Sequence, residues 1–455
     1  MANLGRVLII GAGPTGLGAA FRLLELGHRD VLLLEASDVI GGLAASYVDE
    51  KGFTWDVGGH VQFSHYPYFD ALVERALGPE DWLRHERQSW VWSRGRFVPY
   101  PFQYNIRHLP PEDSKRCLDG LDHASAGGPP PANFAEWILR RFGVGIAELF
   151  MIPYNLKVWA YPLEQLSYGW IGERVATIDA QRARENVRLG RDEVSWGPNN
   201  TFRFPRRGGT GEVWRRVAAM IGTARIRLRA QVSSIDAGRR RVKLSDGGEE
   251  PFDALLNTGP LDRFARGVEG LSGAIQERAA GLRHSTTHVV GIGLRGQPKR
   301  ELAKKCWIYF PEADCPFYRA TVFSNYSPHN VPEPGRQWSL LTETSASPMK
   351  PVDESTIVDR TIEGLRNTGL IDPRDEIVSV WRHTAPYGYP TPTLDRDAIL
   401  AEVQPALESK GLFSRGRFGA WRYEVSNQDH SVMQGVEWAD RIVSGKTETV
   451  FRSPA

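Results

Sequence analysis

The feature that most constrains the fold is a glycine-rich turn near the N-terminus, between a short apolar run and an Ala- and Leu-rich stretch. The apolar run covers residues 7–10, and Gly11, Gly13 and Gly16 follow it. Gly11 permits a tight turn, Gly13 lets the backbone approach a pyrophosphate, and Gly16 lets a helix pack closely against a strand. The free N–H groups and positive dipole end of such a helix favour a bound anion. The pattern predicts a dinucleotide-binding βαβ unit.

The next residues indicate which dinucleotide binds. A second apolar run, residues 31–34, ends on Glu35, about 20 residues after the glycines, where a carboxylate can accept hydrogen bonds from ribose hydroxyls. Glycine pairs follow at positions 41–42 and 58–59. They indicate a long ligand contacted by backbone on several sides, which fits an extended FAD better than a nicotinamide dinucleotide. The arrangement resembles the glutathione-reductase-like FAD fold of amine oxidases, protoporphyrinogen oxidases and UDP-galactopyranose mutases.

Composition excludes several other classes of protein. The 455 residues carry 56 basic and 54 acidic side chains, a balance that argues against nucleic acid as a partner. No apolar run approaches the roughly 20 residues of a membrane span, and the chain enters its first strand without room for a signal peptide. Three scattered cysteines suit neither a disulfide framework nor a metal site. We therefore expect a soluble cytoplasmic protein with no metal and no membrane or nucleic-acid partner.

The hydrophobic pattern changes along the chain and predicts an α/β fold. Residues 134–142 have helical periodicity, residues 226–232 and 288–294 have strand-like character, and residues 433–443 are helical again. We expect a glutathione-reductase-like FAD-binding Rossmann fold with an inserted helical domain and an antiparallel β-sheet domain. The expected segments are 1–107 (first part of the FAD-binding domain), 108–202 (helical substrate-binding domain), 203–287 (second FAD-binding part), 288–386 (antiparallel sheet) and 387–455 (third FAD-binding part).

Aromatic residues interleaved with arginines and amides indicate the substrate. An amine oxidase would need an apolar substrate channel, whereas Arg174 and Arg319, on separate segments, could clamp a diphosphate because guanidinium matches phosphate geometry. Aromatic faces can stack on a base or cover a sugar. Each residue also has an ordinary structural interpretation. Tyr309 could be a core aromatic, Arg174 could pair with the adjacent Glu173, and His60 could be a buried structural histidine.

Six stretches in the same order resemble the eukaryotic-type UDP-galactopyranose mutases, and the similarity extends over essentially the whole chain. These stretches are residues 58–66, 98–103, 204–211, 388–393, 421–424 and 427–430. The resemblance implies that Arg174 and Arg319 bind the substrate diphosphate and that His60 lies beside flavin N5; these three residues form the predicted catalytic set. It also implies a base pocket, with Trp159 and Asn199 bordering the sugar.

The resemblance assigns two further sets by position. The predicted substrate-binding residues are Tyr100, Gln103, Phe150, Asn155, Trp159, Asn199, Tyr309, Tyr326, Tyr389 and Tyr423. The predicted cofactor-binding residues are Gly11, Gly13, Gly16, Glu35, Gly42, Gly58, Gly59, His60, Arg417, Asn427 and Gln428.

The activity implied by the resemblance is interconversion of UDP-galactopyranose and UDP-galactofuranose without net redox change. Reduced FAD would act as the nucleophile through N5, with NADPH or NADH as the reductant, and a homo-oligomer fits the family. Tyr104 and Ile152 depart from the family pattern beside the predicted base pocket, so a related mutase acting on another nucleotide sugar, such as a GDP-hexose, stays open. A flavin oxidase of the amine or protoporphyrinogen type and a non-catalytic nucleotide-sugar-binding protein are the remaining alternatives.

Overall fold

The computed structural model describes residues 4–124, 128–194, 197 and 200–451, and its first layer is a parallel sheet. Five strands lie in the order β20-β13-β1-β2-β9. Helix α1 (Pro14–Glu25) connects β1 to its parallel neighbour β2, which confirms the predicted βαβ unit. Proline in the first turn suits the start of a helix because its missing N–H would have no partner there. The strands are β1 (Val7–Ile10), β2 (Val31–Leu34), β9 (Ile226–Arg227), β13 (Ala254–Asn257) and β20 (Leu412–Ser414).

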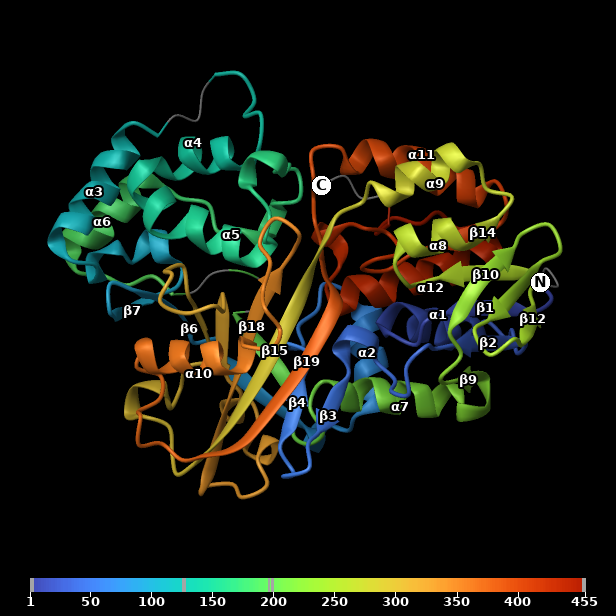
Figure 1. Cartoon of the computed structure of the whole chain (residues 1–455), viewed down its shortest axis with the longest axis horizontal. Coiled ribbons are helices and arrows are strands. Elements are labelled where there is room, and N and C mark those ends of the chain that lie inside the picture. The colour runs from blue at the N-terminus through green and yellow to red at the C-terminus, as the bar shows by residue number, and fades with distance from the viewer. Residues whose placement is uncertain (1–3, 125–127, 195–196, 198–199, 452–455) are drawn as a thin grey trace.

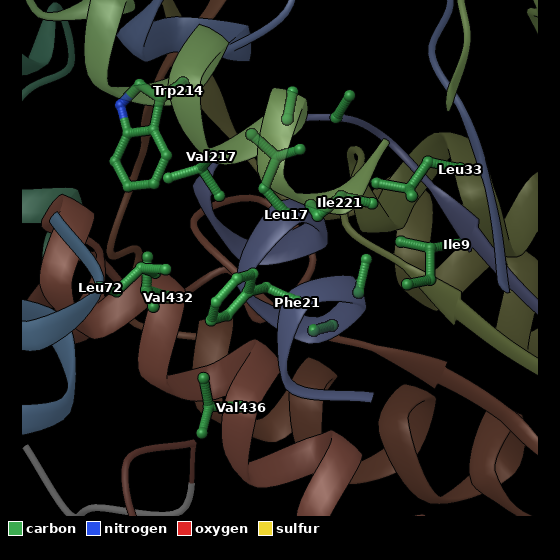
Figure 2. Close-up of a cluster of buried hydrophobic side chains, with 14 of the residues drawn as sticks. Ile9, Leu17, Phe21, Leu33, Leu72, Trp214, Val217, Ile221, Val432 and Val436 are labelled. Atoms are coloured by element: carbon green, nitrogen blue, oxygen red, sulfur yellow. The ribbon is translucent and has the colours of Figure 1, made fainter. Parts of the chain in front are cut away.

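Helix α1 is covered by α7 (Gly211–Ile221) and α12 (Gln428–Ser444). Glycine permits the close contact with α12, because a Cβ on Gly435 would lie 2.1 Å from the carbonyl oxygen of Thr15. Figure 2 shows Leu17 and Phe21 of α1 among apolar side chains of the other two helices. The helix that begins at the glycine-rich turn is therefore fixed by packing along its length.

The second layer is a seven-stranded sheet in the order β19-β15-β18-β17-β16-β6-β7, in which only β16 and β6 are parallel neighbours. Gly291 and Gly293 of β15 leave room for the rings of Trp55 and Phe53, since a Cβ at either glycine would lie within 2.6 Å of a ring carbon. The segment 1–107 supplies strands to both large sheets. The strands are β6 (Ser89–Ser93), β7 (Arg96–Pro99), β15 (His284–Arg295), β16 (Trp307–Tyr309), β17 (Arg319–Val322), β18 (Gln337–Ala346) and β19 (Ile377–Pro390).

A group of helices lies beside the upper end of this sheet, at the upper left of Figure 1, around its own apolar cluster. The predicted helix over residues 134–142 is confirmed, and α4 continues to Ile146 after a kink at Gly143, whose φ is 68°. Gly120 and Gly145 allow α3 and α4 to approach closely, because a Cβ on Gly145 would lie 2.6 Å from backbone of α3. The helices are α3 (Pro111–Asp122), α4 (Phe134–Ile146), α5 (Ile152–Trp159) and α6 (Ala180–Leu189).

Smaller elements complete the fold. The expected strand over residues 226–232 is divided, because β9 ends at Arg227 and Arg229 adopts a φ of 55° before the next strand begins. No helix in the described ranges is long and apolar enough to cross a bilayer. The other strands are β3 (Ser46–Val48), β4 (Thr54–Asp56), β5 (Trp82–Glu86), β8 (Thr201–Pro205), β10 (Val232–Asp236), β11 (Arg241–Leu244), β12 (Glu249–Pro251) and β14 (Val268–Glu269). The other helices are α2 (Pro67–Ala76), α8 (Leu261–Gly267), α9 (Gly273–Ala280), α10 (Ile357–Asn367) and α11 (Arg396–Glu408).

Candidate active site

A cavity of about 940 Å³ lies between the parallel sheet and the seven-stranded sheet, with Glu173 and Arg174 from the segment between α5 and α6 on its wall. Ile10, Leu34 and Asn257, the last residues of three parallel strands, form part of its wall. Ligands of open α/β sheets bind outside the carboxyl ends of the strands in this way. The cavity also reaches Arg319 on β17 and Arg174 beside the helical group, so one continuous space connects the nucleotide-binding turn to both predicted diphosphate ligands.

The glycine-rich turn forms one end of the cavity. Gly11 has a φ of 102°, and a Cβ there would lie 2.3 Å from Thr258 Oγ1. A Cβ on Gly16 would lie 2.1 Å from the carbonyl oxygen of Gly11, so the turn and the first turn of α1 are in direct contact. Gly13 is the N-cap and supplies no side-chain acceptor, which leaves the N–H groups of the first helical turn for a ligand.

Glu35 follows β2 and faces the same end of the cavity. Its carboxylate accepts hydrogen bonds from the backbone N–H of Ala12 at 2.8 Å and from the backbone N–H and hydroxyl of Ser37 at 2.9 Å. These donors fix the carboxylate beside the glycine-rich turn, where it can accept further hydrogen bonds from a ribose. The glycine cradle and this oriented carboxylate fit the adenosine diphosphate part of FAD.

The predicted flavin end is built on the turn from Gly58 to His60. Gly58 has a φ of 107°, and the N–H of His60 donates to its carbonyl oxygen at 2.9 Å. Burial lowers the pKa of His60 to about 4, so the imidazole is neutral at pH 7. Its Nδ1 is buried without a hydrogen-bond partner in the described structure, which is the kind of polar atom that a bound group usually satisfies. Nearby, Gln428 is held by hydrogen bonds to its Oε1 from Gln62 and Trp214, at 2.9 and 2.8 Å.

Arg319 is held by Glu343, a residue that the sequence analysis did not identify. Its Nε and Nη2 donate to the two carboxylate oxygens of Glu343 at 2.8 and 2.7 Å. Burial opposes ionisation of the carboxyl, but Arg319 more than compensates, and the pKa of Glu343 lies below its usual value. Glu343 also accepts a hydrogen bond from the Tyr318 hydroxyl at 2.8 Å and from the Gly59 N–H at 3.0 Å.

Arg174 approaches the cavity from the opposite side, at the end of a 3-10 turn. Its Nη1 donates to Asn427 Oδ1, its Nη2 donates to the carbonyl oxygen of Glu424 at 2.8 Å, and its guanidinium lies 5.3 Å from the ring centre of Tyr423. Both predicted diphosphate ligands therefore line one cavity and keep part of the guanidinium for a ligand. The alternative considered for Arg174, a pair with the adjacent Glu173, does not form; Glu173 Oε1 instead lies 2.8 Å from His65 Nε2.

Arg417 lies between the two in a different environment. Its Nε and Nη2 donate to the carbonyl oxygen of Gly388 at 3.2 and 2.8 Å, and its Nη1 donates to Ser426 Oγ at 2.9 Å. Burial lowers its pKa from the ordinary arginine value. Its guanidinium also lies 4.9 Å from the ring centre of Tyr389. The predicted site residues Tyr100, Tyr309, Tyr389 and Tyr423 all line the cavity around these arginines.

Several predicted substrate residues lie behind this wall. Phe150 stacks between Phe102 and Tyr154 at 5.0 and 5.2 Å, and Trp159 packs edge-on against Tyr423. Three other predicted substrate-binding residues do not line the cavity. Gln103 donates to the carbonyl oxygen of Ala176 at 2.5 Å, and Asn155 donates to that of Met151 at 2.7 Å. Tyr326 is buried among Phe202, Phe204 and Phe323. Asn199 lies outside the described residues.

A polar cluster at the start of α12 was also missed. Asp429 accepts a hydrogen bond from His65 Nδ1 at 2.6 Å and lies 3.0 Å from His430 Nδ1. The hydrogen bond to Asp429 raises the pKa of His65. Asp429 stands in the recognised stretch 427–430, so its position was available from the sequence. Glu343 was not, because it stands inside a buried strand of mixed polar and apolar residues without a motif.

Comparison with known proteins places the chain in a family. Residues 14–443 match the model of the flavin-containing amine oxidoreductases. The structure superimposes on that of a reduced UDP-galactopyranose mutase with a TM-score of 0.96 and 48% identity, over 99% of this chain and 96% of that chain. A putrescine oxidase structure, with a TM-score of 0.66 and 15% identity over 96% of this chain and 99% of that chain, shares the fold alone.

Curated relatives match a shorter region. The 15-cis-phytoene desaturase of Arabidopsis thaliana is 40% identical over 101 residues, which are 21% of this chain and 18% of the desaturase. The desaturase of Glycine max is 38% identical over 100 residues, 21% of this chain and 17% of that protein. The chain thus spans less than a fifth of these relatives. From the family match and the full-length structural likeness, this chain belongs to the flavin-containing amine oxidoreductase family and, within it, is a flavin-dependent mutase of the UDP-galactopyranose mutase type.

Proposed function

We propose that the protein interconverts UDP-galactopyranose and UDP-galactofuranose with reduced FAD. The observation that carries this proposal is that Arg174 and Arg319 line the same cavity as the glycine-rich turn and Glu35. A nucleotide-sugar mutase needs a dinucleotide site, a diphosphate site and space for a sugar in one enclosure. A flavin oxidase acting on an amine has no use for two arginines there.

The residues supply binding and electrostatics. Bound reduced FAD supplies an electron-rich nucleophile for the anomeric carbon of the sugar. Arg174 and Arg319 hold the diphosphate and stabilise the negative charge that develops on it as the bond to the sugar breaks. Tyr309, Tyr389 and Tyr423, which line the same cavity, help the two arginines to bind the diphosphate.

The residues around the predicted base pocket do not decide between UDP and another nucleotide as part of the substrate. Tyr104, one of the two departures from the family pattern, accepts a hydrogen bond from the N–H of Asp179 at 2.9 Å, and Gln103 already donates to a backbone carbonyl. These contacts occupy the Tyr104 hydroxyl and the Gln103 amide nitrogen, whereas the buried Gln103 Oε1 has no hydrogen-bond partner among the described residues. A GDP-hexose is therefore the second candidate substrate.

The proposed function also includes a reductant, a cellular compartment and an assembly state. NADPH or NADH reduces the flavin through the same cavity, because the sequence holds no second glycine fingerprint for a nicotinamide dinucleotide. The protein works in the cytoplasm, where reduced nicotinamides and nucleotide sugars are both available, and it assembles as a homo-oligomer.

A product assay tests this function. The FAD-loaded protein is reduced anaerobically with dithionite, then incubated separately with UDP-galactose, a GDP-hexose and a dTDP-hexose. We expect chromatography to show a furanose product from UDP-galactose and none from oxidised protein. A furanose product from the GDP-sugar alone would select the second candidate. No furanose product from any sugar, with oxygen consumption on amines, would refute the proposal in favour of an oxidase.

A further inference from the structure

The carboxylate of Glu343 joins two parts of the site that come from distant segments. Glu343 on β18 is the register partner of Arg319 on the neighbouring antiparallel strand β17, so both side chains stand on the same face of the sheet. Its side chain is 4% exposed and accepts four hydrogen bonds. Two come from Arg319, one from Tyr318, and one from the N–H of Gly59.

The Gly59 contact connects this carboxylate to the flavin-facing turn. A Cβ on Gly58 would lie 3.2 Å from Glu343 Oε2, and one on Gly59 would lie 2.5 Å from Thr321 Oγ1, so the turn rests directly on the sheet. His60 follows Gly59 and lines the cavity. A displacement of the carboxylate therefore cannot leave the turn in place.

The geometry of Arg319 shows what the carboxylate does for the ligand. Glu343 occupies one edge of the guanidinium, Nε and Nη2, in a bidentate pair. In the described part of the chain, Nη1 has no hydrogen-bond acceptor, and the side chain is 22% exposed. Held at one edge, the planar guanidinium can turn only its other edge toward the cavity.

We propose that Glu343 is a positioning residue that orients Arg319 toward the diphosphate and, through the Gly59 N–H, couples diphosphate binding to the flavin-facing turn. The inference rests on the proposed function, because it takes Arg319 as a diphosphate ligand. It adds a link between two halves of the site that the sequence places 284 residues apart.

Two substitutions separate the two contacts. Glu343→Gln removes the charge and places an amide donor against the donors of Arg319 or Gly59. Glu343→Asp keeps the charge but shortens the side chain, so that one carboxylate cannot reach both Arg319 and Gly59. Glu376→Gln is the matched control, since Glu376 pairs with Arg295 at 2.7 Å on the surface of the same sheet.

UDP binding to the oxidised FAD-loaded protein provides the readouts: Kd from equilibrium dialysis and the change that UDP causes in the flavin absorption spectrum. For wild type and Glu376→Gln we expect tight binding and a clear spectral change. For Glu343→Gln we expect at least a tenfold higher Kd and no spectral change. For Glu343→Asp we expect a Kd within about threefold of wild type with a reduced spectral change.

The results separate a failure of the proposed function from a failure of the positioning role of Glu343 alone. If wild type binds neither UDP nor another nucleoside diphosphate, the proposed function fails. If wild type binds UDP and either FAD-loaded Glu343 variant keeps both the Kd and the spectral change within twofold, only the positioning role fails. Because loss of one partner of a buried pair can prevent folding, Glu343→Asp, which keeps the ion pair, decides the question if Glu343→Gln does not retain FAD.

Discussion

Among the described residues, five arginines line the cavity, and three of them, Arg174, Arg319 and Arg417, differ in how much of each guanidinium remains for a ligand. All three nitrogens of Arg417 already donate to Gly388 or Ser426. Arg174 and Arg319 each use two nitrogens on protein acceptors, which leaves one side of each guanidinium. Arg417 therefore contacts the protein through all three nitrogens, and we expect Arg174 and Arg319 to be better suited to bind a diphosphate.

Substitution of these two arginines tests that assignment. We expect Arg174→Ala and Arg319→Ala each to lower kcat/KM at least 100-fold, because hydrogen bonds between charged partners contribute about 1.5–3 kcal/mol each and more than one is lost. FAD content should stay near wild type in Arg174→Ala, because Arg174 does not lie at the glycine-rich turn. Arg319→Ala leaves the buried Glu343 carboxylate without its partner, so Arg319→Lys, which keeps the charge, replaces it if Arg319→Ala does not retain FAD. Steady-state kinetics and the flavin-to-protein absorbance ratio measure both effects.

The control for this experiment is Arg295→Ala, which removes an arginine from a surface ion pair with Glu376 and should leave kinetics unchanged. Normal kcat/KM in both cavity variants would show that the diphosphate binds elsewhere.

A buried carboxyl gives a prediction about stability and pH. Asp56 is fully buried, where it accepts hydrogen bonds from Ser46 and from the N–H of Thr210, and burial raises its pKa to about 7. An unfolded aspartate titrates near pH 3.9, at about its model-peptide value. The native state thus binds the proton of Asp56 more tightly than the unfolded state does. The stability that this protonation contributes is fully present below about pH 4 and is lost as the pH rises through about 7.

We expect Asp56→Asn to reduce the fall in unfolding free energy between pH 5 and pH 8, measured by urea denaturation of the FAD-loaded protein. Asp359→Asn, at an exposed position on α10, is the control and should leave the pH dependence unchanged. Equal pH dependence in Asp56→Asn and wild type would contradict the assignment.

At the scale of elements, the contact between α1 and α12 places the first turn of the nucleotide-binding helix directly against Gly435. Thr15 and Gly435 meet at this contact, and Thr15 also lines the cavity. The apolar side chains in Figure 2 hold the rest of α1, but its first turn depends on the absence of a side chain at Gly435. A substitution at Gly435 on α12 should therefore weaken the binding of FAD at the glycine-rich turn.

We expect Gly435→Ala to lower Tm by several degrees and to weaken FAD binding at least tenfold. Alanine gains about 1 kcal/mol of helix propensity over glycine, but overpacking costs about 1–3 kcal/mol. The new Cβ would lie 2.1 Å from the carbonyl oxygen of Thr15, so one of the two helices must move. Thermal denaturation and FAD titration of apoprotein measure the two effects.

Gly273→Ala is the matched control, because nothing lies within 4 Å of a Cβ at that position of α9. A Gly435→Ala protein with wild-type Tm and FAD affinity would show that α12 does not constrain the turn.

For the whole molecule, the cavity is lined by residues of both large sheets and by Glu173 and Arg174 from the segment between α5 and α6. Figure 1 shows these groups of elements around the centre of the molecule. Residues from the parallel sheet, the seven-stranded sheet and the helical side each face it. A ligand that fills this space contacts all three groups at once and binds only when they are assembled.

Removal of FAD should therefore destabilise the whole chain. We expect apoprotein to melt at lower temperature, and FAD at 100 times its Kd to restore about 2.7 kcal/mol of stability. FMN lacks the adenylate that reaches Glu35 and should restore much less. Differential scanning calorimetry with each flavin checks this, and an equal effect of FMN would contradict the placement of the adenosine end.

The sequence alone determined the local parts of this protein. The βαβ unit, the position of Glu35 after β2 and the helix over residues 134–142 depend on periodicity and turn chemistry among close neighbours. The resemblance extended this to the fold class and to the two arginines that line the cavity.

Only the tertiary structure decided which side chains meet. Arg319 and Glu343 lie 24 residues apart and pair because of the register between β17 and β18. A shift of one residue would turn Glu343 to the other face of the sheet, and no local pattern sets that register. The same holds for Tyr326 and Phe150, which the resemblance assigns to the substrate and which the structure packs among other aromatic rings. An aromatic ring suits a core contact and a ligand contact equally, so its residue type does not decide between them.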